Sequence, residues 1–112
     1  MKRTYLGEFE EIILLTVAYL QGQAYGVKIT HEIIEQTHRP VRLNQVHVAL
    51  HRLQEKGMVQ SRLGEATPER GGRRKRLFFI TAHGEQTLLD IQALRSQLWG
   101  LLPQPLSAAL HS

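Results

Sequence analysis

Hydrophobic and polar residues alternate along this chain in a pattern that predicts four helices. Within each segment the apolar residues recur every three or four positions, so that they share one face of a helix. Residues that end or cap helices fall at the boundaries: Gly22 after the first segment, Gly57 after the third and Thr81 before the last. The predicted helices cover residues 7–20, 25–37, 43 or 44 to 56, and 82–102.

The first three helices each have an apolar face that we expect to contribute to one shared core. The expected core residues are Phe9, Ile12, Ile13, Thr16, Val17 and Leu20 in the first helix, Val27, Ile29, Ile33 and Ile34 in the second, and Val46, Ala49, Leu50 and Leu53 in the third. A chain of 112 residues is long enough for a single domain built around such a core.

Two short segments after the third helix are predicted to be β-strands, at residues 58–65 and 75–81. The second contains Leu-Phe-Phe-Ile-Thr, a run typical of strands. Between them, Pro68, Gly71 and Gly72 suit a narrow hairpin tip. The predicted fold class is mainly α with a small β-hairpin (α+β). It comprises a winged helix-turn-helix domain over residues 1–81 with its wing at 58–81, a C-terminal helix at 82–102 and a short tail at 103–112.

Composition and charge narrow the function classes. The chain has no cysteine, and its longest apolar run, residues 12–20, is much shorter than the roughly 20 residues of a membrane-spanning helix. Its first residues lack the pattern of a secretory signal, so we expect a cytoplasmic protein without membrane partners. The pI near 9.9 favours an anionic partner, and nucleic acid is the commonest one.

The net charge is concentrated in the predicted wing. The formal charge of the whole chain is +4, and residues 62–76 alone contain six basic and two acidic side chains. A thin arginine-bearing loop fits the narrow, negative minor groove of DNA, and glycines let its backbone approach phosphates. The predicted DNA-binding residues of the wing are Arg70, Gly71, Gly72, Arg73, Arg74 and Lys75. The alternative is a charged loop that serves only solubility.

The third helix carries side chains that can read base edges on the face opposite its apolar stripe. Amides can bond adenine, arginine can bond guanine, and a small apolar side chain can touch a thymine methyl. The predicted recognition residues are Asn44, Gln45, His47, Val48, His51 and Arg52. Taken alone, the same pattern also fits a solvated helix face.

Several stretches resemble the PadR-type transcriptional regulators. These are "YGVKI" at 25–29, "ALHRLQEKGMV" at 49–59 and "GGRRKRLFFITAHGEQTL" at 71–88, with "LGEFEEIILL" similar to the family's first helix. The resemblance covers about residues 6–102 and implies a cytoplasmic, bacterial, dimeric winged-helix repressor, often released from its operator by a small molecule. The family usually has tyrosine in the place of His47 and often proline in the place of Val48. We therefore do not carry a relative's operator sequence over to this chain.

The last predicted helix has an apolar stripe that we expect to form a homodimer interface. Its residues are Leu88, Ile91, Leu94, Leu98, Leu101 and Leu102. The alternative is a helix that folds back onto its own domain. Trp99, beside the stripe, is either part of the same packing or a stacking surface for a small aromatic effector.

No catalytic constellation is present, so we expect neither an enzyme nor a cofactor. His47 and His51 have the i, i+4 spacing of a zinc pair, but no third ligand on the same helix can complete a tetrahedral site, and no metal is expected. The function predicted is a sequence-specific, DNA-binding transcriptional regulator, a dimeric repressor on a palindromic operator. The alternative is a winged-helix module for protein interaction or RNA binding, in which the basic wing is a generic anchor.

Overall fold

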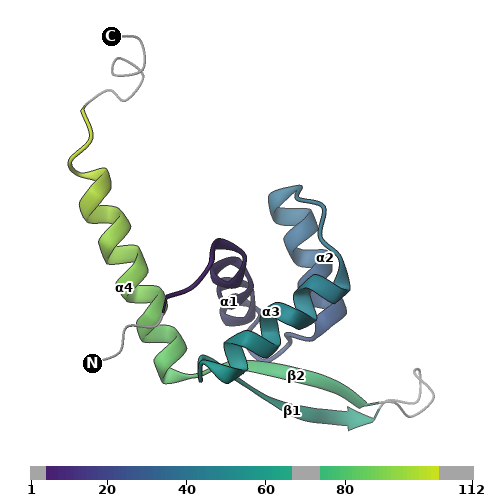
Figure 1. Ribbon diagram of the computed structural model, residues 1–112. Coiled ribbons are helices and arrows are strands. Elements are labelled where there is room, and N and C mark those ends of the chain that lie inside the picture. The colour runs from purple at the N-terminus through teal and green to yellow at the C-terminus, as the bar shows by residue number, and fades with distance from the viewer. Residues whose placement is uncertain (1–4, 67–73, 104–112) are drawn as a thin grey trace.

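Three helices, a two-stranded hairpin and a fourth helix follow one another along the chain (Figure 1). This computed structural model describes residues 5–66 and 74–103. The elements are α1 (Glu8–Leu20), α2 (Gly26–Thr37), α3 (Leu43–Glu55), β1 (Val59–Ala66), β2 (Arg74–Ile80) and α4 (Ala82–Trp99). The predicted fold class is confirmed, and the predicted strands differ from β1 and β2 by one residue at each end.

A single core lies between α1, α2, α3 and the base of the hairpin. Its buried apolar residues are Ile13, Leu14, Val17, Ala24, Ile29, Ile33, Val46, Ala49, Leu50, Leu53, Met58, Val59 and Phe78. All four residues predicted for the core face of α3 are among them. Burying apolar surface of this kind supplies the main favourable free energy of folding.

Two core predictions for α2 are wrong. Val27 and Ile34 are each 40% exposed, whereas Ile29 and Ile33 are fully enclosed. Gly26 and Thr30 occupy the buried positions beside these isoleucines, and the Thr30 hydroxyl donates a hydrogen bond to the Gly26 carbonyl oxygen at 2.8 Å. The small residue and the self-satisfied hydroxyl let α2 approach its neighbours closely, and Val27 and Ile34 lie to the side of that contact.

The hairpin is tied to the helices through β2. β1 and β2 pair antiparallel from Val59 opposite Ile80, with a register irregularity between Leu63 and Ala66. The Phe78 N–H donates to the Ala24 carbonyl oxygen at 2.8 Å, which fixes the segment just before α2 against the strand. The wing therefore leaves the domain from a rigid base.

α4 begins on the domain and then extends away from it, as Figure 1 shows. The predicted cap is confirmed: Thr81 Oγ1 accepts from the Gly84 N–H at 3.0 Å, and it donates to the Gly57 carbonyl oxygen at 2.7 Å. Gly84 and Thr87 are buried, and Leu88 packs against the core. The helix ends at Trp99, about one turn before the predicted end, because Gly100 favours a helix terminus.

The acidic first turn of α1 forms ion pairs with three other parts of the chain. Glu8 meets Arg39 Nη2 at 2.9 Å, and Glu11 meets Arg95 Nη2 of α4 at 2.9 Å. Glu10 accepts from Lys56 Nζ, at the end of α3, at 2.8 and 3.0 Å. Burial raises the pKa of Glu10, but hydrogen bonds from Lys56 and the Gly7 N–H, with the charges of Lys56 and Arg52, outweigh burial and lower it below its ordinary value.

The contact between α4 and the hairpin requires a glycine at position 84. A Cβ there would overlap the Met58 carbonyl oxygen and lie 2.8 Å from Ile80 Cγ1. We expect Gly84→Ala to lower the free energy of unfolding by about 1–3 kcal/mol, because the backbone of α4 must shift to relieve the overlap. Thermal unfolding followed by circular dichroism measures the loss.

Gly100→Ala is the matched control at the other end of the same helix. A Cβ there meets nothing closer than 3.4 Å, and the residue's φ of −64° suits alanine. This variant should be as stable as the original protein or slightly more stable. Equal stability of the Gly84→Ala variant and the original protein would contradict the close contact.

Candidate nucleic-acid interface

The predicted recognition residues all lie on the exposed side of α3. Val46, Ala49, Leu50 and Leu53 turn into the core, and the opposite face is open. The exposed residues on that face are Asn44, Gln45, His47, Val48, His51 and Arg52. Asn44 and Gln45 stand in the first turn, the part of a recognition helix that enters the major groove most deeply.

The two amides at the start of α3 differ in their hydrogen bonds. Gln45 Oε1 accepts from the Arg42 N–H at 2.9 Å and so caps the helix. Bidentate recognition of adenine uses both the oxygen and the nitrogen of an amide, so the oxygen of Gln45 has either to serve the cap and the base together or to leave the cap. The Asn44 side chain makes no hydrogen bond within the described residues, and both of its amide atoms are available.

The two histidines of α3 have different surroundings. His51 Nε2 lies 3.6 Å from Glu55 Oε1, and both side chains are largely exposed. His47 instead lies beside the start of α2, where a Cβ on Gly26 would come within 2.8 Å of its Cε1. Within residues 5–66 and 74–103, no three histidine, cysteine or acidic side chains are grouped as a metal site.

Of the predicted wing residues, Arg74 and Lys75 open β2, while Arg70, Gly71, Gly72 and Arg73 lie outside the described residues. Lys75 Nζ stands 4.3 Å from the centre of the Tyr25 ring. Arg76 Nη1 donates to Ser61 Oγ at 3.1 Å, across the hairpin. Arg62 lies over the Phe79 ring at 4.5 Å on the same hairpin. These contacts hold Arg62 and Arg76 against the hairpin and Lys75 against the residue that precedes α2.

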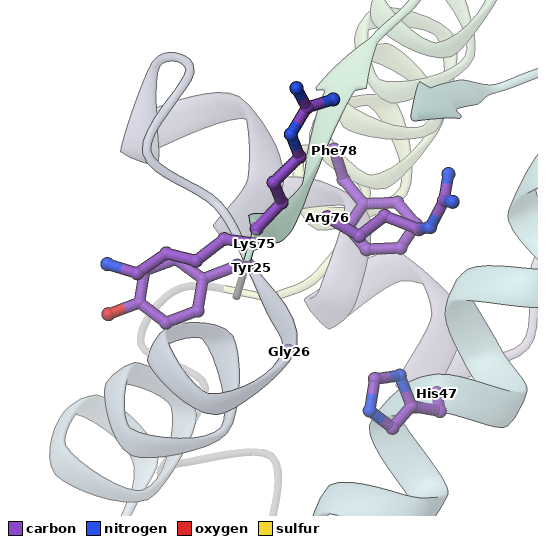
Figure 2. A pocket seen from close by; sticks show the side chains of 7 residues that line it. Tyr25, Gly26, His47, Lys75, Arg76 and Phe78 are labelled. Atoms are coloured by element: carbon purple, nitrogen blue, oxygen red, sulfur yellow. The ribbon is translucent and has the colours of Figure 1, made fainter. Parts of the chain in front are cut away.

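A cavity of about 250 Å³ joins the wing to the recognition helix. Figure 2 shows it between the start of α2, the side chain of His47 from α3 and the basic side chains of β2. Three cations, Arg74, Lys75 and Arg76, line it, and no acidic side chain of the described residues does. Tyr25 and Gly26 also line it. Tyr25 and Gly26 were not predicted as site residues from the sequence. The signal that points to them is a glycine at the start of a helix, next to an aromatic residue.

Charge is distributed unevenly over the domain. The acidic residues of α1 neutralise Arg39, Lys56 and Arg95, all away from the cavity. Among the described residues, Arg74 and Lys75 form no ion pair. The start of β2 therefore keeps its positive charge, which attracts a polyanion.

The predicted interface residues, four on α4 and two just after its end, differ in their exposure. Leu88 packs on the core, and Ile91 and Leu102 are half-buried. The exposed fractions of Leu94, Leu98 and Leu101 are 58%, 55% and 76%, and that of Trp99 is 60%. The second half of α4 therefore does not fold back onto its own domain. No described helix is long and apolar enough to span a membrane.

Comparison with known proteins identifies the family. The chain matches the transcriptional regulator PadR-like family over residues 14–90, more than half of its length. No curated protein matches it.

Solved structures share the fold at low sequence identity. A PadR-like transcription factor from Bacteroides fragilis is 21% identical, with a TM-score of 0.69 over 80% of this chain and 82% of that one. A PadR-like transcriptional regulator from Bacillus cereus is 20% identical, with a TM-score of 0.64 over 93% and 92%. A PadR family regulator from Eggerthella lenta is 19% identical, with a TM-score of 0.64 over 83% and 80%. The family match and the shared fold agree, and the chain belongs to the PadR-like family of DNA-binding transcriptional regulators.

Proposed function

We propose that this regulator is a dimeric repressor that binds a palindromic operator, with α3 in the major groove and the wing on the adjacent minor groove. One observation supports it most: the exposed polar face of α3 and the cationic start of β2 border the same cavity, through His47 and Lys75. A duplex lying along α3 therefore meets the wing as well. The base edges supply specificity and the phosphates supply most of the affinity.

The dimer is proposed from the exposed apolar half of α4. Isolated apolar side chains on a surface need no explanation, but a continuous stripe indicates an interface. α1 presents two more exposed apolar side chains, Leu15 and Tyr19, one and two turns beyond the Glu11 that pairs with Arg95. A second copy that brings its own α4 against these surfaces covers both of them with twofold symmetry.

The twofold assembly accounts for the palindrome and for repression. Two α3 helices related by a twofold axis read two inverted half-sites about one helical turn of DNA apart. A dimer bound in this way covers its operator and excludes polymerase from an overlapping promoter. Trp99 remains our proposed contact for a small aromatic effector, because its indole is 60% exposed next to the stripe.

A gel-shift assay with a palindromic fragment of the protein's own promoter, competed by excess random DNA, tests this function. The expected result is a complex that survives a large excess of random competitor, since specific binding is typically about 10³–10⁷ times tighter than non-specific binding. Loss of the complex at modest competitor would support the alternative, a winged-helix module with a generic basic anchor.

The hydrogen bonds of the two amides predict different consequences for their replacement. Asn44→Ala should relax the preference at one operator position, at a cost of about 1–3 kcal/mol there, and leave folding unchanged. Gln45→Ala should also lower thermal stability, because the Arg42 N–H loses its cap. Binding to operators that carry each base at each position, together with thermal unfolding, separates the two effects.

Gln45→Glu is the control for capping, because a glutamate at this position accepts the same hydrogen bond. It should restore the thermal stability that Gln45→Ala loses. An unchanged base preference in the Asn44→Ala variant would remove Asn44 from the recognition residues.

A further inference from the structure

The cavity between α2, α3 and β2 has the size and charge of an anion site. Its volume is about 250 Å³, which leaves room for a phosphate group and several waters of about 30 Å³ each. Arg74, Lys75 and Arg76 border it, and no acidic side chain of the described residues offsets their charge. The space is therefore bordered by three positive side chains and by the imidazole of His47.

The walls of this cavity are held in place by contacts that do not involve a ligand. The hydrogen bond from the Phe78 N–H to the Ala24 carbonyl oxygen joins β2 to the residue just before Tyr25. On the other side, Gly26 lets the start of α2 approach α3, because any Cβ there would come within 2.8 Å of the His47 ring. Preformed walls lower the entropic cost of ordering a site when its ligand binds.

The side chains that border the cavity are also supported. The Tyr25 ring lies under the Lys75 ammonium at 4.3 Å, and Ser61 Oγ accepts from Arg76 Nη1 at 3.1 Å. Figure 2 shows Lys75 extended along Tyr25, with the His47 ring on the far side of the space. α2, α3 and β2 thus each supply one wall, and together they can contact one anion from different directions.

We propose that this cavity holds one phosphate of the DNA backbone, and that His47 grips this phosphate together with Lys75 instead of reading a base. The inference rests on the proposed DNA-binding function and refines it. A helix in the major groove has a phosphate backbone along each side, and phosphate contacts fix its register on the duplex. His47 lies at the edge of α3 nearest α2 and β2, whereas Asn44 is free in the first turn to meet the bases.

A methylphosphonate scan of the operator tests this assignment. Each duplex carries one uncharged methylphosphonate in place of a phosphate, and the dissociation constant is measured for the original protein and for His47→Ala and Lys75→Ala variants. At one position in each half-site the original protein should lose about tenfold in affinity. Both variants should bind unmodified DNA more weakly. The methylphosphonate at that same position should lower their affinity little further, because their contact to this phosphate is already gone.

His51→Ala is the matched control, because His51 lies one turn further along α3, pairs with Glu55 and does not line the cavity. His51→Ala can change base preference, since His51 is a predicted recognition residue, but it should keep the full sensitivity to methylphosphonate at the position that His47 and Lys75 contact. Base preference should stay unchanged in His47→Ala, since a phosphate contact carries no sequence information. Thermal unfolding checks that all three variants are folded.

A failure of this inference and a failure of the proposed function give different results. If the original protein forms no specific complex, the proposed function fails. If it binds specifically and His47→Ala keeps the original methylphosphonate profile but changes base preference, His47 reads a base and the inference is overturned.

A second arm uses inorganic phosphate at constant ionic strength. Millimolar phosphate should leave DNA binding unchanged if the cavity takes a phosphodiester of the duplex. Two results together would overturn the proposal and mark the cavity as a site for a small free anion. Phosphate would displace DNA, and His47→Ala and Lys75→Ala would weaken binding at every methylphosphonate position alike.

Discussion

Replacing Leu98 with glutamate should convert the protein into a folded monomer. Leu98 is 55% exposed on the outer half of α4, so the charge does not enter the core of the single chain. In the proposed dimer the same residue is central to the apolar stripe, where an unpaired carboxylate is costly to bury. Sedimentation at micromolar concentration should show about twice the chain mass of 12.8 kDa for the original protein and the chain mass itself for the variant.

The same change should weaken operator binding far more than it weakens any single contact. A dimer engages two half-sites at once, and a linked second contact raises affinity by about 10²–10⁴. We therefore expect Leu98→Glu to lose at least about a hundredfold in affinity for the palindrome, with little change on a single half-site. The far-ultraviolet helical signal should remain.

Ser96→Glu is the matched control for added charge on α4. Two residues rotate a helix by about 200°, so Ser96 lies on the side opposite Leu98. This variant should remain dimeric and bind the operator normally. An original protein that sediments as a 12.8 kDa species would exclude the dimer, and unfolding of Leu98→Glu would mean that α4 packs within its own chain.

The pattern of apolar residues predicted most of the fold because the period of a helix and the burial of one face are local properties. The core face of α3 follows from that period, and the cap at Thr81 and the two strands follow from the residue types at those positions. The errors at Val27 and Ile34 have a tertiary cause. α2 approaches its neighbours through Gly26 and Thr30, and a hydrophobicity pattern gives a glycine no weight in a core.

The candidate site was only partly predictable for a similar reason. The charge cluster and the polar face of α3 are visible in the sequence, but the cavity that joins them is not. Tyr25 and Lys75 are distant along the chain and meet only because the backbone of β2 pairs with Ala24. Nor does the sequence indicate that Gln45 caps its own helix or that His47 lies against Gly26, since both depend on side-chain positions.

The ion pairs of α1 neutralise basic residues that lie away from the wing. Acidic residues at a helix start are usually explained by the helix dipole, and here they also bind Arg39, Lys56 and Arg95. Those basic residues are neutralised where they stand. The positive charge of Arg74 and Lys75 at the start of β2 is not offset by an ion pair within the described residues, which favours the approach of a duplex on that side.

Replacing Arg73 and Arg74 with alanine should weaken specific and random DNA binding alike. Arg74 is exposed at the start of β2, and Arg73 precedes it in the part of the wing outside the described residues. Each phosphate contact that is lost should reduce the slope of log affinity against log salt by about 0.9. Two wings lose up to four contacts, so the slope should fall by roughly 3 to 4.

Replacing the same two arginines with lysine keeps the charge and separates electrostatics from loop shape. The lysine variant should retain nearly the whole salt slope, because counterion release depends on the charge delivered to the phosphates. It should lose some affinity where a guanidinium fits the narrow minor groove better than an ammonium does. A folded alanine variant with an unchanged salt slope would show that these charges do not reach the DNA, and the wing would then be a solvated loop.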